Sequence, residues 1–308
     1  MSAPFAPRIN LYDAIAANRL RTFVLLVGFV GVVVALAWAI GEYLAPGGGI
    51  AVLPFALALA GGSAAFSYYA GDKVVLAQSG AKPIAAGEEP VLHNVVETLA
   101  LGLGIPTPAL YVIDDSAPNA FATGRDPKHA SVAVTRGLLD KLDRSELEGV
   151  VAHELSHVGN RDIRVMLLVA ILLGMIALLS DWFLRSMIWG GGRRRGRDRD
   201  GGGGLVVVIA LALAIVTPII GAAIQMAVSR QREYLADASG ALLTRYPQGL
   251  ASALRKISSD TEALEVANKA TASLYIANPL KDRPALFDGL FDTHPPIAER
   301  IKRLEAMG

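Results

Sequence analysis

The chain has 308 residues, a net charge of +1 and no cysteine, and hydrophobic residues make up 53% of it. With only 19% charged residues and a mean hydropathy of +0.42, it is too apolar for an ordinary water-soluble protein, which predicts membrane segments. The near-neutral charge argues against nucleic-acid binding, and the lack of cysteine excludes disulfides, thiolate metal ligands and a cysteine nucleophile.

Two apolar runs near the start predict a transmembrane hairpin within residues 1–71. Residues 23–41 are uncharged and exceed the roughly 18 apolar residues that suffice to cross a bilayer. The length of this run and the poor cleavage site favour a signal anchor over a cleavable signal peptide. The second run covers about residues 50–70. Arginines before the hairpin and lysines after it predict that both of its ends are cytoplasmic.

Residues 72–164 mix polar and apolar side chains, which predicts the first part of a water-exposed domain. A helix is expected over residues 88–103, followed by a small sheet. Residues 109–113 read as a strand, residues 119–124 as a short strand of small residues, and residues 131–135 alternate as a further strand. We expect His93 to be a solvated or packed histidine and His129 to lie on the surface.

The next segment reads His153-Glu154-Leu155-Ser156-His157. In a helix the two histidines lie on one face, one turn apart, so that both imidazoles reach one zinc ion. Glu154 then projects where it can act on a metal-bound water. The alternative is a helix that carries two histidines by chance, although the chain has only five.

The flanking residues favour a helix here. Asp143 and Ser145 are N-cap candidates, and Ser145 with Glu148 has the spacing of a capping box. Gly159-Asn160 is a plausible end. An apolar stripe that should face the core is made of Leu147, Val151 and Leu155.

A second hydrophobic hairpin is expected over residues 165–229, with apolar runs at about 165–184 and 205–229. Between them lies a loop rich in arginine and glycine, whose composition cannot form a core. The length of the apolar run at residues 205–229 favours two membrane crossings. A re-entrant hairpin with no crossing is the alternative, because two crossings put the arginines outside, against the positive-inside rule.

Residues 230–308 are polar and mostly helix-like, the expected second part of the water-exposed domain. Glu233 and Asp237 share a helix face at i and i+4. Catalytic zinc commonly takes two histidines and one carboxylate, so Glu233 is a candidate third ligand. Asp237 is a candidate hydrogen-bond acceptor for a ligand imidazole. A solvated, charged helix end is the alternative interpretation.

With these residues the chain resembles the HtpX-like, M48-type membrane zinc metallopeptidases, relatives of the CAAX prenyl proteases. The resemblance rests on four pieces in the family's order, which are residues 118–124, 153–162, 232–237 and 293–296 with Arg300. It implies a mainly α membrane protein with transmembrane hairpins and a gluzincin-like α+β domain containing a small sheet.

The resemblance also implies roles for residues. One Zn²⁺ per chain is held by His153, His157 and Glu233, with Glu154 as the base. His294 stabilises the oxyanion, unless it is only a turn residue before two prolines. Arg300 pins its loop to a carboxylate. An exposed edge strand pairs with an extended substrate, unless it is an ordinary sheet strand; its residues are Asn119, Ala120, Phe121 and Ala122.

The function implied is a zinc endopeptidase, multi-pass in the cell inner membrane with its site on the cytoplasmic side. Its substrates would be misfolded or damaged membrane proteins, or other unfolded polypeptides, as part of a stress response. One alternative is a prenyl-protein processing peptidase, and another is a non-catalytic membrane scaffold with a structural zinc. No P-loop pattern is found in the sequence, so we expect no ATP requirement from this chain.

Overall fold

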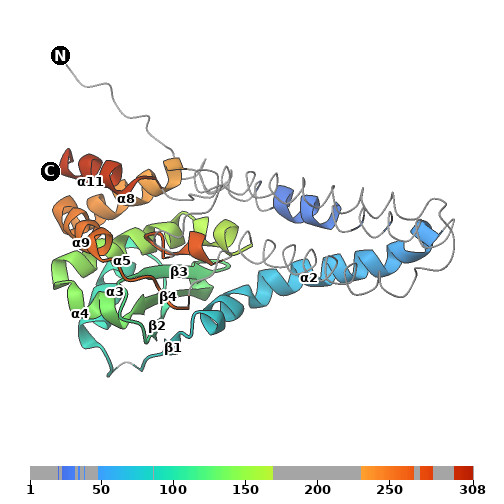
Figure 1. The fold of residues 1–308 in the computed structure, drawn as a ribbon, viewed down its shortest axis with the longest axis horizontal. Helices are drawn as coiled ribbons and strands as arrows, with labels where there is room; N and C mark the ends of the chain where they lie inside the picture. The colour runs from blue at the N-terminus through green and yellow to red at the C-terminus, as the bar shows by residue number, and fades with distance from the viewer. Residues whose placement is uncertain are drawn as a thin grey trace, which may run out of the picture.

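A computed structural model describes residues 20, 23–31, 34, 38, 48–85, 87–168, 230–266, 271–279 and 295–307. In this part of the chain, helices surround a small mixed sheet, and one long helix projects from the resulting domain (Figure 1). The mostly helical class with a small sheet is thus confirmed. His294 and the arginine/glycine loop lie outside the described residues, as does all of the second hairpin after Leu168.

The projecting helix α2 (Gly48–Gln78) contains the predicted second apolar run and continues past its end. It is the one helix among the described residues that is long and apolar enough to cross a membrane. Large side chains along its projecting part, such as Phe55 and Phe66, are exposed, whereas Val75 and Leu76 are buried in the domain. One continuous helix therefore joins the apolar segment to the domain. In the first apolar run, the described residues 23–31, 34 and 38 are helical.

The sheet has the strand order β1-β2-β4-β3. β2 (Ala109–Ile113) pairs parallel to β4 (Ala130–Thr135), which pairs antiparallel to β3 (Ala120–Gly124). These three strands confirm the predictions to within one residue. The short β1 (Lys82–Pro83) pairs antiparallel to β2 and was not predicted, because two residues carry no alternating pattern.

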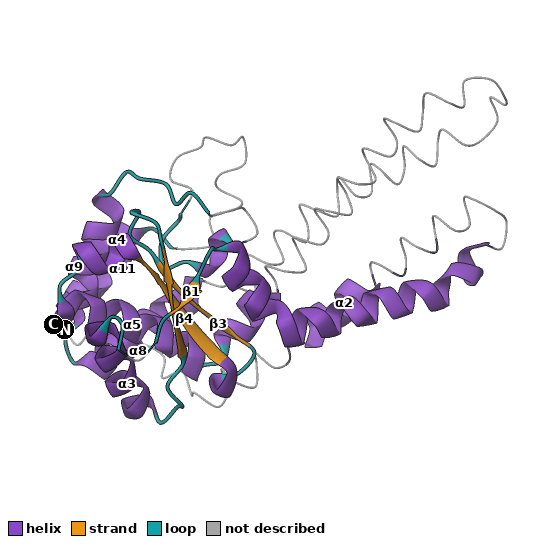
Figure 2. Cartoon of the chain, turned by 90° about the horizontal axis from the view of Figure 1, so that it is seen from below, coloured by secondary structure: helices purple, strands orange, loops and turns teal. Residues whose placement is uncertain are grey.

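Helices cover the sheet and close the domain (Figure 2). α3 (Pro90–Leu103) and α5 (Arg144–Gly159) share a core with Ala120 and Ala122, while Phe121 points to a second core containing the end of α2. The larger core includes residues from Leu92 to Leu304 on both sides of the predicted second hairpin, so the two water-exposed segments fold together. The remaining elements are α4 (Arg136–Lys141), α8 (Arg230–Thr244), α9 (Pro247–Ser259), α11 (Ile297–Glu305) and the 3-10 helices η1 (Pro127–His129) and η2 (Ala272–Leu274).

Helix α5 lies at the centre of the domain, and its sequence explains its bounds. Asp143 is the N-cap and accepts hydrogen bonds from the backbone N–H groups of Ser145 and Glu146, while Glu146 bonds back to the Asp143 N–H. The capping box is therefore Asp143 with Glu146, and the predicted pair Ser145 with Glu148 is wrong. The apolar stripe of Leu147, Val151 and Leu155 is buried, and the helix ends at Gly159, both as predicted.

Candidate metal centre

Three predicted donor side chains meet inside the domain. His153 and His157 lie one turn apart on α5, and Glu233 reaches them from the first turn of α8. The donor atoms of the three residues lie within 4.8 Å of one another, and all three residues are buried. Residues about 75 positions apart in the sequence thus form one cluster of nitrogen and oxygen donors.

The spacing of the donors suits a small tetrahedral ion. The Nε2 atoms of His153 and His157 are 3.2 Å apart, and the carboxylate oxygens of Glu233 lie 3.7 and 3.5 Å from them. Ligands placed about 2.0–2.1 Å from a tetrahedral zinc are separated by about 3.3 Å. The donor set therefore fits zinc and leaves a fourth position for water.

Each histidine is oriented by a carboxylate at its other nitrogen. Nδ1 of His153 lies 2.9 Å from Oδ1 of Asp237, and Nδ1 of His157 lies 3.3 Å from Oδ2 of Asp162. When Nδ1 of each histidine carries the proton and donates to its carboxylate, the lone pair of Nε2 points toward the space between the three donor residues. Asp237 was predicted for this contact. The sequence does not predict this contact for Asp162, because a residue beyond the helix end has no fixed spacing to His157.

Arg300 holds Asp237 in place. It is fully buried on α11, where Nε and Nη2 donate to the two carboxylate oxygens of Asp237 at 2.9 and 2.7 Å. Its Nη1 donates to the carbonyl of Ile276 at 2.9 Å. Burial alone would raise the pKa of Asp237, but the Arg300 charge and the bond to His153 keep that pKa below its usual value. The expected contact of Arg300 with a carboxylate is confirmed.

Glu154 lies beside the donor cluster without belonging to it. The backbone N–H of Ala122, in β3, donates to its Oε2 at 2.8 Å. Burial raises the pKa of Glu154 to about 8, although the nearby His157 opposes the shift. A carboxyl group with a pKa this close to neutrality can both accept a proton and return it. A cation at the neighbouring donors would lower that pKa.

Strand β3 is at the edge of the sheet as expected, but it is not exposed, because all five of its residues are buried. The Asn119 side chain donates to the carbonyl of Ala277, and the carbonyl of Ala120 accepts from the N–H of Ile276. Phe121 points to the other face of the sheet, where its ring packs on Tyr275 at 5.0 Å. Of the four predicted substrate residues, Ala122 is the one whose backbone contacts Glu154.

Among the described residues, the two remaining histidines, His129 and His93, take no part in this cluster. His129 is exposed and lies 2.8 Å from Asp126, as predicted for a surface residue. His93 is half-buried on α3, which agrees with a packed histidine. His294 lies outside the described residues, so its predicted role stays a prediction.

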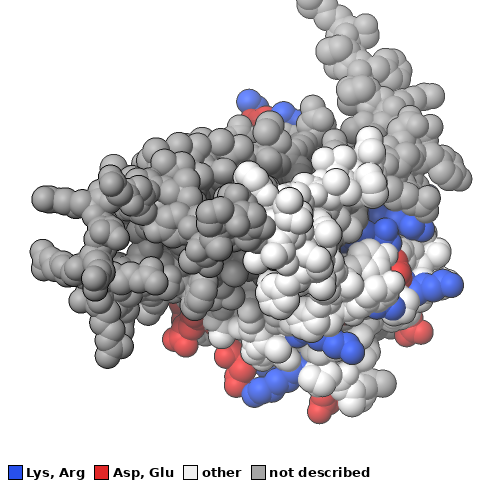
Figure 3. All heavy atoms as spheres, turned by 90° about the vertical axis from the view of Figure 1, so that its right-hand side faces the viewer, with Lys and Arg blue, Asp and Glu red and all other residues white. Residues whose placement is uncertain are grey.

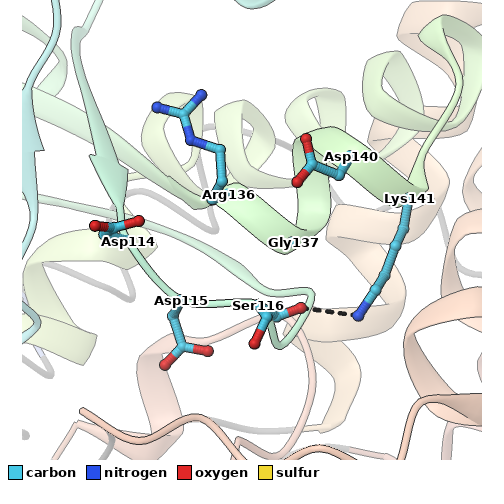
Figure 4. Close-up of a pocket in the computed structure, with 7 residues that line it drawn as sticks. All are labelled: Asp114, Asp115, Ser116, Arg136, Gly137, Asp140 and Lys141. Carbon is cyan, nitrogen blue, oxygen red and sulfur yellow. Dashed lines mark hydrogen bonds between the residues drawn. The ribbon is translucent and has the colours of Figure 1, made fainter.

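A separate polar depression lies near the start of α4 (Figure 4). Lys141 donates there to the carbonyl of Ser116 at 2.8 Å and pairs with Asp260 at 2.6 Å. None of the predicted site residues lines it. Its lining consists of Asp114, Asp115, Ser116, Arg136, Gly137, Asp140 and Lys141.

Comparisons with known proteins give consistent matches. A model of the family described as Peptidase family M48 matches residues 86–308. A relative named Protease HtpX homolog, from Tropheryma whipplei (strain Twist), is 45% identical over 298 residues, covering 97% of this chain and 99% of the relative. A relative of the same name from Thermoanaerobacter pseudethanolicus is 47% identical over 302 residues, with coverage of 97% and 99%. The crystal structure of S. mikatae Ste24p is similar with a TM-score of 0.49 and 19% identity, covering 96% of this chain and 67% of that chain.

Proposed function

The chain belongs to peptidase family M48, and we propose that it is a zinc-dependent endopeptidase anchored in a membrane. Membership of the family makes it a protease that acts on polypeptides. The proposal adds the metal, the residues that act and the location. It is carried by one observation, the buried donors His153, His157 and Glu233 within 4.8 Å of one another, with Glu154 beside them.

We assign the metal to this donor set because its chemistry suits zinc. Two imidazoles and one carboxylate are typical zinc ligands, and three protein ligands leave one position for water, as in catalytic sites. A structural zinc would have four protein ligands, and the described residues bring three together, which argues against a non-catalytic scaffold. Zinc bound there supplies a Lewis acid and lowers the pKa of a bound water to about 7.

Glu154 is proposed to handle the protons. Its carboxylate takes a proton from the attacking water and then delivers it to the leaving nitrogen of the peptide. The hydrogen bond from Ala122 holds one carboxylate oxygen, so the other is available to the water. His294 is proposed to donate a hydrogen bond to the oxyanion that develops on the attacked carbonyl.

The substrate strand is proposed to lie along β3. The backbone of Ala120 and Ala122 points away from β4, because these residues bond to Ile276 and Glu154. Because this edge is buried and these bonds occupy it, an extended polypeptide would pair with it through its own backbone only after these contacts open. We propose that Ala122 meets the substrate, while Asn119, Ala120 and Phe121 shape the strand.

The membrane location rests on α2, whose projecting part exposes large apolar side chains. We propose residues 1–71 and 165–229 as membrane hairpins of a multi-pass protein in the cell inner membrane. Residues 72–164 and 230–308 then form one metalloprotease domain. Lys73 and Lys82 after the first hairpin favour the cytoplasmic side for the active site. Misfolded or damaged membrane proteins are the proposed substrates.

The test measures zinc content and proteolysis of the full chain in detergent, against an unfolded membrane-protein substrate. Glu154→Gln should keep zinc and lose hydrolysis by roughly 10²- to 10⁴-fold, the usual contribution of a general base. His153→Ala should lose both zinc and hydrolysis. Cleavage by Glu154→Gln at the wild-type rate would overturn the mechanism. Activity on a farnesylated peptide alone would favour the prenyl-processing alternative.

A further inference from the structure

Two arginines and two tyrosines gather where α2 enters the domain. We propose that Arg125, Arg164, Tyr68 and Tyr69, here named the headgroup collar, bind the phosphate groups of anionic lipids and hold the domain against the membrane surface. The proposal rests on the membrane location given in the proposed function. It concerns residues distinct from the zinc ligands and from Glu154.

The four side chains form one connected cluster. The rings of Tyr68 and Tyr69 meet edge to face, with centroids 4.9 Å apart and planes at 80°. The guanidinium of Arg164 lies 5.4 Å from the Tyr68 ring centroid, and that of Arg125 lies 5.5 Å from the Tyr69 ring centroid. Nε of Arg164 also donates to the carbonyl of Arg125 at 2.6 Å. The two positive charges are therefore held at the base of an apolar helix.

These charges are weakly neutralised by the protein. Within the described ranges Arg164 makes no ion pair, and the only one that Arg125 makes is with Asp126, at 3.8 Å. Asp126 itself lies closer to His129, at 2.8 Å. Asp72 on α2 pairs with neither arginine. A phosphate ester suits such a site because guanidinium groups bind its oxygens in bidentate fashion.

The length of α2 independently places the membrane boundary at the collar. About 20 residues from Gly49 to Tyr68 span about 30 Å, the thickness of the hydrocarbon core. The first charged residue of the helix, Asp72, follows one turn later. Tyrosines are enriched at the membrane–water interface, where their rings lie at the level of the headgroups. The collar arginines therefore lie at the depth of the lipid phosphates.

The surface around α2 agrees with this placement. Viewed from the projecting end of α2, the described surface at the centre is uncharged, and charged side chains of both signs lie below it and to its right (Figure 3). Arg125 directly follows β3, and Arg164 lies five residues beyond the end of α5. Lipid binding at the collar would therefore hold β3 and α5 close to the membrane surface. There they would be within reach of polypeptide segments that leave the bilayer.

The first test measures lipid binding by the full chain in detergent, titrated with phosphatidylglycerol and followed by native mass spectrometry. Arg125→Gln/Arg164→Gln should bind this lipid roughly 25-fold more weakly, because each basic residue at an anionic surface contributes about fivefold. Arg125→Lys/Arg164→Lys keeps both charges and should retain most of the affinity. The matched control Arg144→Gln/Arg255→Gln removes two exposed arginines elsewhere and should bind as the wild type does.

Equal binding by the Gln double variant and the wild type would overturn the proposal. So would competition by inorganic phosphate at the concentration at which the lipid binds, because a free phosphate would then be the ligand. These readouts need no hydrolysis. A failed cleavage experiment would therefore overturn the proposed function and leave the lipid result unaffected, and the reverse also holds.

The second test measures the depth of α2 in vesicles containing phosphatidylglycerol. Because the chain has no cysteine, single spin labels can be placed at Ala65→Cys and Ala77→Cys, both exposed positions. The label at position 65 should be accessible to oxygen dissolved in lipid, and the label at position 77 to a water-soluble relaxing agent. If the label at position 65 were accessible to the water-soluble agent, or were immobilised by contact with another protein, the proposed depth of α2 in the membrane would be wrong.

Discussion

His153 and His157 direct their Nε2 atoms into one small volume because a carboxylate holds each ring from behind. The two carboxylates are supported differently. Asp237 receives two hydrogen bonds from the buried Arg300, whereas Asp162 lies 3.7 Å from Nε of Arg232. Orientation of the ligands therefore depends on residues from α8, from α11 and from the segment that follows α5, which the ligand motif does not include.

Asp162→Asn should weaken zinc binding by roughly 10- to 100-fold, the usual effect of losing a carboxylate behind a metal-binding histidine. The substitution keeps the shape of the side chain and removes its charge, so we expect the fold to be retained. Zinc affinity can be measured by competition with a coloured chelator. Asp140→Asn, at an exposed position, is the matched control. Equal affinity in both variants would show that Asp162 does not support His157.

At the scale of elements, α5 is held against its neighbours by glycines that permit close approach. A Cβ atom at Gly149 would lie 2.5 Å from the backbone nitrogen of Leu250 in α9. A Cβ at Gly240, in α8, would lie 3.0 Å from the backbone nitrogen of His153. The helix that carries the histidines is thus packed backbone to backbone with two later helices.

Gly149→Ala should destabilise the protein by about 1–3 kcal/mol, because the methyl group forces α5 and α9 apart. Gly159→Ala, at the end of the same helix, meets nothing within 4 Å and serves as the control. It should be neutral or slightly stabilising, since alanine loses less backbone entropy in a helix. Thermal unfolding in detergent measures both. Equal stability of the two variants would contradict the close packing.

An ion pair between the half-exposed Lys256 and the buried Glu146 also joins α9 to α5 and makes stability depend on pH. Lys256 and Ser252 contact the carboxylate of Glu146 at 2.6 and 2.7 Å. Burial would raise the pKa of Glu146, but these hydrogen bonds outweigh burial and lower that pKa from its ordinary value of 4.5. The stabilisation is therefore fully present above about pH 4.5 and is lost as the pH falls through the folded-state pKa.

Lys256→Met should lower stability at pH 7 by about 1 kcal/mol, since half of the lysine side chain is exposed to water. It should also reduce the loss of stability between about pH 5 and pH 3, because less stabilisation remains to be lost. Melting temperatures across this range measure both effects. Lys302→Met, exposed on α11, should show the wild-type pH dependence. An unchanged pH profile in Lys256→Met would show that the Lys256–Glu146 pair is not the source of this pH dependence.

At the scale of the whole molecule, the candidate metal site connects segments that the second predicted hairpin separates in sequence. His153 and Glu233 come from α5 and α8, and both helices belong to one hydrophobic core. Metal binding should therefore stabilise the assembled domain, because the unfolded chain does not hold these donors together.

Adding zinc to the chelated protein should raise its stability by about 4 kcal/mol when free zinc exceeds the dissociation constant 1,000-fold. His153→Ala should show little or no such gain, because one of its three donors is missing. The measurement is the melting temperature of the full chain with chelator and with added zinc. An equal gain in both proteins would indicate that zinc binds elsewhere.

Much of this architecture follows from local patterns in the sequence. The apolar run at residues 109–113 predicts β2 and the alternation of residues 131–135 predicts β4, while the stripe along α5 predicts its buried face. The N-cap of α5 is harder to predict from the sequence, because both Asp143 and Ser145 suit the position. β1 could not be predicted, since its two residues form a strand only through pairing with β2.

The sequence by itself determined the His-Glu-x-x-His helix, the candidate carboxylate Glu233 and the apolar helix α2, because each depends on composition or on spacing within one helix. Only the tertiary structure decided that Asp162 lies behind His157, that Ala122 donates to Glu154 and that β3 is buried. It also decided that two arginines gather at the base of α2. Each of these contacts joins residues that no helical or strand period relates, so packing of the core alone brings them together.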